Sequence, residues 1–166
     1  VRCLKVVGGY IGDDDACSKL LCDVMRKKLR PLEKIKHMRD GQVIQNVEQL
    51  QRGLLSRVAS AIPSYWLRLM RPSVTTPAAI VAYDLLADAV TSIYSLRDPP
   101  AARTELALTQ MFLPAGQGCS GLGVIAPRQI IDASYASASY ATWPSTVSAV
   151  PELAADLTAS PSTLHT

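Results

Sequence analysis

The sequence predicts a mainly helical fold, a bundle of about five to six helices with a short N-terminal strand. Aromatic residues make up only 5% of the 166 residues, so the core must be built from Leu, Val, Ile and Ala, which favours helices. Apolar residues also recur at helical spacing, most clearly along VIQNVEQLQRGLLSRV, and prolines or aspartates stand where helices would begin. A chain of this length is expected to form one domain.

The first expected elements are a strand and a basic helix. Residues Cys3–Ile11 (CLKVVGGYI) are β-branched and interrupted by two glycines, which is typical of a short strand. The acidic run Asp13–Asp15 can cap a helix and favours its positive end, so a helix is expected over Asp15–Arg30. Pro31 is expected to kink or restart this helix, and a basic turn is expected over Lys34–Arg39.

The middle of the chain is expected to join two helical halves. After a break at Asp40-Gly41, a second helix is predicted over Gln42–Ser60. Ala61–Pro77 (AIPSYWLRLMRPSVTTP) holds three prolines, and it is expected to form one or two helical turns between bounded ends. Thr76 is then expected to cap a long helix over Pro77–Leu96, with proline at its first position.

The C-terminal half is predicted to be less regular. A fourth helix is expected over residues 98–112, followed by a glycine-rich loop, AGQGCSGLG, with backbone at positive φ. A weak helix of Ala, Ser and Tyr is expected over Arg128–Thr142. Residues 1–153 therefore form the expected domain, and residues 154–166 a flexible Ser/Thr-rich tail.

The net charge of +3 conceals an asymmetry between the two halves. Residues 1–72 hold 14 Lys and Arg against 7 Asp and Glu, a net charge of +7, whereas residues 73–166 carry −4. A basic half is typical of proteins that bind a polyanion, most commonly RNA. Charge alone leaves open the alternative that these side chains only form a solvated, solubilising helix face.

Cysteine usage and hydropathy indicate a protein inside the cell. The four cysteines form no C-x-x-C pair and only two His are present, so reduced, buried thiols are expected and a zinc site is not. The longest apolar run, Pro77–Leu96, is interrupted by Asp84 and Asp88, so no ordinary membrane span is expected. Because the chain begins with Val, we expect it to be processed, incomplete at its start or part of a longer protein.

No pattern of catalytic residues stands out. GYIGDDD is similar to the Y-x-D-D metal site of polymerases, but its spacing is one residue too long, and helix capping accounts for all three aspartates. The glycine-rich loop lacks the Lys-Ser/Thr of a phosphate-binding loop. We therefore expect no catalytic residue, no metal, no cofactor and no small-molecule substrate.

The aromatic and basic cluster YWLR, with Arg71 close behind it, has two interpretations. Tyr65 and Trp66 could stack on bases while Arg68 and Arg71 pair with phosphates. Alternatively, Trp66 and Leu69 anchor the core and the arginine stems cover them. The apolar surroundings favour core anchoring.

The order of motifs resembles the C-terminal part of reverse-transcriptase-like proteins of non-LTR retroelements. VVGGYIGDD resembles the LG-x-x-IG strand that closes the palm, and QLQRGLLSRVASAIPSYWLRLMRPS resembles the helices that lead to a yllR-x-x-pP segment. LPAGQGCSGLGV resembles LP-x-x-x-GGLGL, although Cys119 and Ser120 expand its glycine core. IIDASYASASYATW resembles the helix after it. The resemblance spans Val1 to about Leu153.

The resemblance implies a thumb and connection region, which in this family grips the template–primer duplex through backbone contacts. Both catalytic carboxylate motifs would lie upstream of Val1, so a non-catalytic, RNA-associated subunit of a ribonucleoprotein is expected; an organellar ribosome, as in mitochondria, would fit. The expected partners are structured RNA, such as ribosomal RNA, and neighbouring proteins of a large complex. The residues expected to contact RNA phosphates are Arg26, Lys27, Lys28, Arg30, Lys34, Lys36, Arg39, Arg52, Arg57, Arg68 and Arg71.

Two alternatives remain open. The chain could be the C-terminal piece of an active reverse transcriptase, in which case an in-frame Y-x-D-D motif would precede it in the transcript. It could also be a protein–protein scaffold without RNA contact, in which case the basic segment Arg26–Arg39 would pair with acidic residues of a neighbouring protein.

Overall fold

The computed structural model describes residues 3–6, 8–38, 47–59, 61–93, 105, 108–109, 113, 115–116, 119–121, 123–150 and 152. The elements of this part are β1 (Cys3–Val6), β2 (Gly9–Gly12), α1 (Asp14–Leu29), α2 (Pro31–Lys36), α3 (Val47–Leu54), the π-helix η1 (Leu55–Ala59), α4 (Ala61–Leu69), α5 (Pro72–Ile93), β3 (Ala115–Gly116), β4 (Cys119–Ser120), the 3-10 turn η2 (Pro127–Gln129) and α7 (Ile131–Ala149). The prediction of a mainly helical fold is confirmed.

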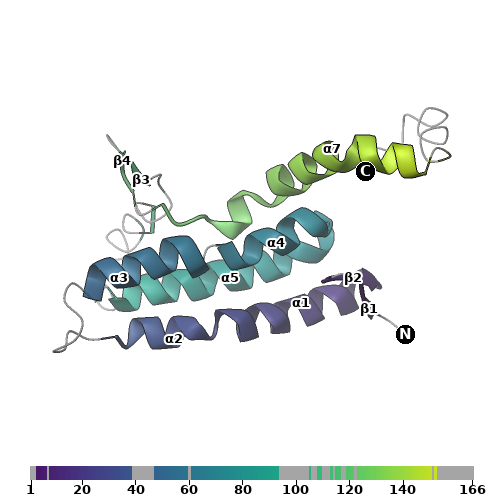
Figure 1. Ribbon diagram of the computed structural model, residues 1–166. Helices are drawn as coiled ribbons and strands as arrows, with labels where there is room; N and C mark the ends of the chain where they lie inside the picture. The colour runs from purple at the N-terminus through teal and green to yellow at the C-terminus, as the bar shows by residue number, and fades with distance from the viewer. Residues whose placement is uncertain are drawn as a thin grey trace.

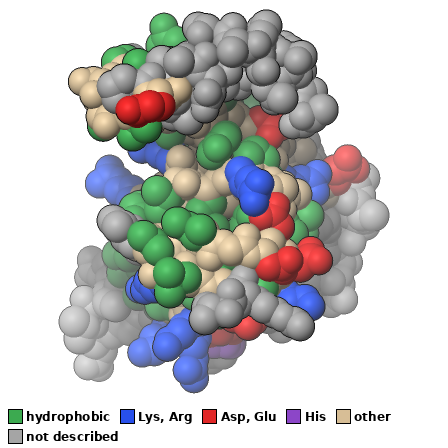
Figure 2. Space-filling view, turned by 90° about the vertical axis from the view of Figure 1, so that its right-hand side faces the viewer, with side chains coloured by type: hydrophobic (Ala, Val, Ile, Leu, Met, Phe, Trp, Pro, Cys, Tyr) green, Lys and Arg blue, Asp and Glu red, His purple; other side chains and the backbone are tan. Residues whose placement is uncertain are grey.

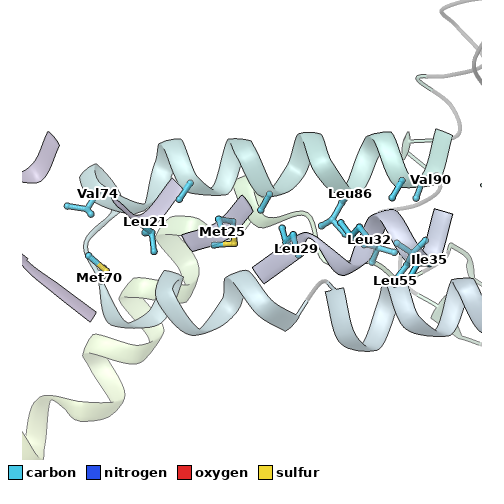
Figure 3. Close-up of a cluster of buried hydrophobic side chains, with 14 of the residues drawn as sticks. Leu21, Met25, Leu29, Leu32, Ile35, Leu55, Met70, Val74, Leu86 and Val90 are labelled. Atoms are coloured by element: carbon cyan, nitrogen blue, oxygen red, sulfur yellow. The ribbon is translucent and has the colours of Figure 1, made fainter. Parts of the chain in front are cut away.

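The described helices of the bundle form three rods that lie side by side (Figure 1). One rod is α1 continued by α2, the second is α3, η1 and α4, and the third is α5. The core fills the space between them (Figure 3). Its buried side chains are Cys17, Leu21, Met25, Leu29, Leu32, Ile35, Leu55, Met70, Val74, Ala78, Ala82, Leu86, Ala89, Val90 and Val124.

The first rod forms largely as its sequence predicts. The carboxylate of Asp13 accepts a hydrogen bond from the Ala16 backbone N–H at 2.9 Å and so caps α1, which has acidic residues in its first turn and basic residues in its last. Pro31 restarts the chain as α2, where it occupies a first-turn position that needs no hydrogen-bond donor. The basic turn expected from Lys34 is wrong in part, because the helix continues to Lys36 and buries Leu32 and Ile35.

The long helix α5 begins at Pro72, so its expected start at Thr76-Pro77 is wrong. Pro77 lies inside the helix. The preceding turn is helical because it buries Val74 and Thr75, which are 3% and 0% exposed. The Thr76 hydroxyl donates to the Pro72 carbonyl at 2.7 Å, which gives this turn a hydrogen bond of its own. The free energy gained by burying Val74 and Thr75 thus outweighs the tendency of Pro77 to break the helix.

The single N-terminal strand that we expected is in fact a hairpin. Strands β1 and β2 pair antiparallel, with Val6 opposite Gly9 and Cys3 opposite Gly12. Gly8 allows the turn because its φ is +86°, a value that other residues rarely adopt. The Gly8 carbonyl accepts a hydrogen bond from the Trp66 indole N–H at 3.2 Å, so the turn of the hairpin is held against α4.

Substitution of Gly8 by alanine should lower the free energy of unfolding by about 1–3 kcal/mol, because of the strained φ. A Cβ atom at this position would also lie 2.6 Å from the Tyr65 hydroxyl oxygen. Urea denaturation measures the change. Gly53→Ala is the matched control, since nothing lies within 4 Å of its added Cβ in a helix. This variant should be more stable by about 0.4–1 kcal/mol. Equal effects of the two substitutions would contradict the hairpin geometry.

The C-terminal part returns to the bundle and then leaves it. Strands β3 and β4 pair antiparallel within the glycine-rich loop, and η2 follows with Arg128 over the Tyr83 ring at 4.7 Å. Helix α7 is longer than expected; its Ile131 packs with Leu67 and Ala79, while its far end extends away from the bundle (Figure 1).

The predicted helix over residues 98–112 is described only at residues 105, 108 and 109, all helical. The break at residues 40–41, the start of the second predicted helix and residues 154–166 lie outside the described residues.

Among the described helices, α5 is the one long and apolar enough to cross a membrane by length and composition. In the fold it is the third rod of the bundle, and eight of its residues are buried. Such a composition is equally typical of a core helix, and here α5 packs along both α1 and α2.

Candidate nucleic-acid interface

The clearest basic surface runs along the solvent side of the first rod. Lys27, Lys28, Arg30 and Lys34 are exposed, and none of them makes an ion pair with another described residue. This side faces solvent because the opposite side of the rod carries the buried stripe from Leu21 to Ile35. The four positions span about 10 Å of helix at a rise of about 1.5 Å per residue. We call these four residues the basic face.

Arg26 stands beside the basic face but has a local partner. Its guanidinium donates to the Asp23 carboxylate at 3.1 Å, and the two side chains are 59% and 75% exposed. An exposed ion pair of this kind contributes only about 0–1 kcal/mol. A phosphate can therefore replace Asp23 at small cost.

Lys36 is committed to the fold. Its ammonium lies 2.6 Å from Asp88 on α5 and 2.7 Å from Glu33, and its side chain is only 8% exposed. Burial alone would lower its pKa, but the hydrogen bonds and charges of Asp88 and Glu33 outweigh burial and raise the pKa of Lys36. Lys36 therefore links α2 to α5 through its ion pair with Asp88. Unlike the exposed lysines of the basic face, it is not available to bind a phosphate.

Arg71 is also occupied by an acidic partner. It pairs with the Asp14 carboxylate, whose other oxygen accepts a hydrogen bond from the Ser73 hydroxyl at 2.9 Å. The start of α1 is thereby joined to the start of α5. Asp13 caps α1 and Asp14 makes this link, so two of the three aspartates have structural roles. In the described part of the chain, no group of three His, Cys, Asp or Glu could hold a metal ion.

The remaining predicted contacts lie on the second rod. Arg52 donates to the Gly121 carbonyl at 3.2 Å, which connects α3 to the glycine-rich loop. Arg57 and Arg68 are exposed on η1 and α4. The structure therefore gathers Arg26 to Lys34 on one rod and places these three arginines on another, while Arg39 lies outside the described residues.

The aromatic cluster divides between the two interpretations. Trp66 packs partly buried against the core and bonds to Gly8, as the core-anchoring interpretation requires. The anchoring role expected for Leu69 is wrong, because Leu69 is 47% exposed. The buried neighbours are Leu67 and Met70, the latter being the first residue after α4. Tyr65 is 51% exposed and stands edge-on to Trp66, with 5.6 Å between the ring centroids.

Sequence reasoning missed an apolar surface at the end of the bundle. Leu4 and Ile11 of the hairpin are 59% and 64% exposed, and Leu69 of α4 is 47% exposed. Ile11 and Leu69 both line a pocket of about 240 Å³. Figure 2 looks onto this end and shows hydrophobic side chains gathered there, with acidic and basic ones beside them. The sequence signal for this surface is the set of apolar residues in CLKVVGGYI. The same pattern is typical of a single partly buried strand, so it does not by itself predict an exposed apolar surface.

The environment of Cys17 should make stability depend on alkaline pH. Burial, then the hydrogen bond to Cys3 and the negative charges of Asp14 and Asp13, raise the pKa of the Cys17 thiol from 9.0 to about 11. The folded protein thus favours the neutral thiol, so its contribution is complete below pH 9 and is lost as the pH rises toward 11.

A Cys17→Val variant removes this titrating thiol, and the Cys3 thiol thereby loses a hydrogen-bond partner. Relative to the variant, the wild-type protein should lose stability between pH 9 and 11 in urea denaturation. A stability difference that is constant from pH 8 to pH 11 would contradict the effect of burial on this thiol.

A comparison of the chain with known protein families, curated proteins and solved structures finds no match.

Proposed function

We propose that this chain is a non-catalytic, retroelement-derived subunit of a ribonucleoprotein that contacts RNA phosphates. The observation that carries the proposal is the basic face, in which Lys27, Lys28, Arg30 and Lys34 are exposed on one rod without a described acidic partner. The motif order that resembles the thumb and connection of reverse transcriptases supports the same kind of ligand, a nucleic-acid backbone.

The chemistry of the basic face suits phosphates better than a folded acidic protein surface. Three of its four residues are lysines, whose ammonium groups act as flexible point charges and impose little geometry. Phosphate contacts of this type fix position without reading sequence. Arg26 extends the face once Asp23 is displaced, because that pair is exposed and weak. The lysines would recognise the RNA by its backbone, and the resemblance to a region that grips a duplex favours a structured RNA, such as a ribosomal RNA of an organelle.

We also propose that α7 contacts neighbouring proteins of the complex. The far half of α7 carries Tyr140 and Trp143, which are 85% and 41% exposed. Exposed aromatic residues of this kind are enriched in protein interfaces. The same observation favours a second candidate function, a scaffold that joins proteins of a large complex without touching RNA.

Sedimentation of the native assembly separates the two candidates. The tagged chain from cell lysate is run on a sucrose gradient before and after ribonuclease treatment. A ribonucleoprotein subunit should move from heavy to light fractions after treatment, and ultraviolet light should crosslink it to RNA. A heavy peak that resists ribonuclease, with no crosslinked RNA, would overturn the proposal in favour of the scaffold.

A further inference from the structure

Two cysteine sulfurs meet where the hairpin joins the bundle. The sulfur atoms of Cys3 on β1 and Cys17 on α1 lie 2.9 Å apart, closer than an ordinary nonbonded contact. Cys3 is partly exposed, whereas Cys17 is 1% exposed. Cys22 is a useful contrast, since it is also a partly exposed free thiol, but it packs against the core and no sulfur–sulfur contact is found for it among the described residues.

We propose that Cys3 and Cys17 form a reversible disulfide that fastens the hairpin to α1 under oxidising conditions. The contact already brings the two sulfurs together across 14 positions of sequence, so little backbone movement separates the thiol and disulfide forms. The proposal does not depend on RNA binding.

The described residues of the hairpin have few contacts that hold them to the bundle, so a disulfide to α1 would stabilise the position of the hairpin. A two-stranded hairpin is only marginally stable by itself, and most residues of β1 and β2 are exposed. Its turn is held by the bond from Trp66 to the Gly8 carbonyl. Its open end, where Cys3 pairs with Gly12, lies at the other end of the strands. The sulfur pair stands at that open end, so a disulfide would restrain the end that Trp66 does not reach.

The reaction requires an oxidant of the low-molecular-weight disulfide class, such as oxidised glutathione. The partly exposed Cys3 loses its proton and attacks one sulfur of the oxidant, which forms a mixed disulfide and releases one thiolate. The Cys17 sulfur, after losing its proton, then attacks Cys3 and releases the second thiolate. The protein loses two electrons and two protons in total, and the oxidant is reduced to two thiols.

Peptide mapping tests the linkage directly. Trypsin cleavage after Arg2, Lys5, Lys19 and Arg26 places Cys3, Cys17 and Cys22 in three different peptides. The full chain is equilibrated for hours with mixtures of reduced and oxidised glutathione, quenched with acid and digested. We expect a linked pair of CLK and VVGGYIGDDDACSK in the oxidising mixtures, and its disappearance after reduction.

Matched substitutions make the result decisive. Cys22→Ser should leave the linked pair unchanged, whereas Cys3→Ser should abolish it. Cys3→Ser is preferred to a change at the buried Cys17, because the partly exposed position tolerates serine with less risk to folding. Glutathione retained on Cys3, or linkage of Cys3 to Cys22 or Cys119, would overturn the proposal.

Hydrogen exchange tests the fastening itself. Backbone amides of Cys3–Val6 and Gly9–Gly12 should exchange at least about tenfold more slowly in the oxidised than in the reduced protein, because local opening of the open end is restrained. Amides of α5 should be unchanged. Equal exchange of the hairpin in the two forms would overturn the proposed fastening.

Discussion

Replacement of Leu21 by alanine is expected to lower the free energy of unfolding by about 2–5 kcal/mol, a large share of the stability of a typical domain. Leu21 is 0% exposed and lies in the core where α1 faces α5 (Figure 3). The truncated side chain leaves a cavity that three packed rods cannot close fully. Urea denaturation followed by circular dichroism measures the loss.

The neighbouring Leu20 is the matched control. It has the same chemistry and the same helix but is 42% exposed, so Leu20→Ala should change stability by less than about 1 kcal/mol. The comparison removes helix propensity from the result, since both variants replace leucine by alanine in α1. Similar losses for the two variants would contradict the position of the core on one side of this rod.

The double substitution Lys27→Gln and Lys28→Gln is expected to weaken binding of a structured RNA about tenfold or more at low salt, through loss of two phosphate contacts. Both side chains are exposed on the basic face, so the fold should be intact. A filter-binding titration measures the affinity, and circular dichroism verifies the helix content.

Two controls distinguish phosphate contact from a general charge effect. Lys5→Gln with Lys19→Gln removes the same charge from exposed positions outside the basic face, one in β1 and one in the first half of α1, and should leave the affinity nearly unchanged. Lys36→Gln should reduce stability but not affinity, because Lys36 is already paired with Asp88 and Glu33. Equal weakening by both double variants would mean that net charge, and not the basic face, governs binding.

Local chemistry made much of the helical fold predictable. The Asp13 cap and the restart at Pro31 depend on residues within a turn of one another, and these two features are confirmed. Pro77 misled the prediction because its local preference is outweighed by burial of Val74 in a core made by distant segments. The hairpin was missed because pairing depends on the turn at Gly8, which a one-strand pattern does not specify.

The candidate site was less predictable than the fold. Composition identified the basic half of the chain, but it could not separate available charges from occupied ones. Lys36 and Asp88 are 52 positions apart in sequence, and Arg71 and Asp14 are 57 apart, so neither pair follows from local spacing. The contact between Cys3 and Cys17 likewise depends on how the hairpin folds onto α1.

The salt dependence of RNA binding tests the account most directly, because each phosphate contact releases bound counterions. With four contacts, the logarithm of the wild-type binding constant should fall against the logarithm of salt concentration with a slope of about −3. The Lys27→Gln, Lys28→Gln variant should give about −1.5, and the Lys5→Gln, Lys19→Gln control about −3. Absence of binding at low salt, or one common slope for all three proteins, would contradict RNA contact through the basic face.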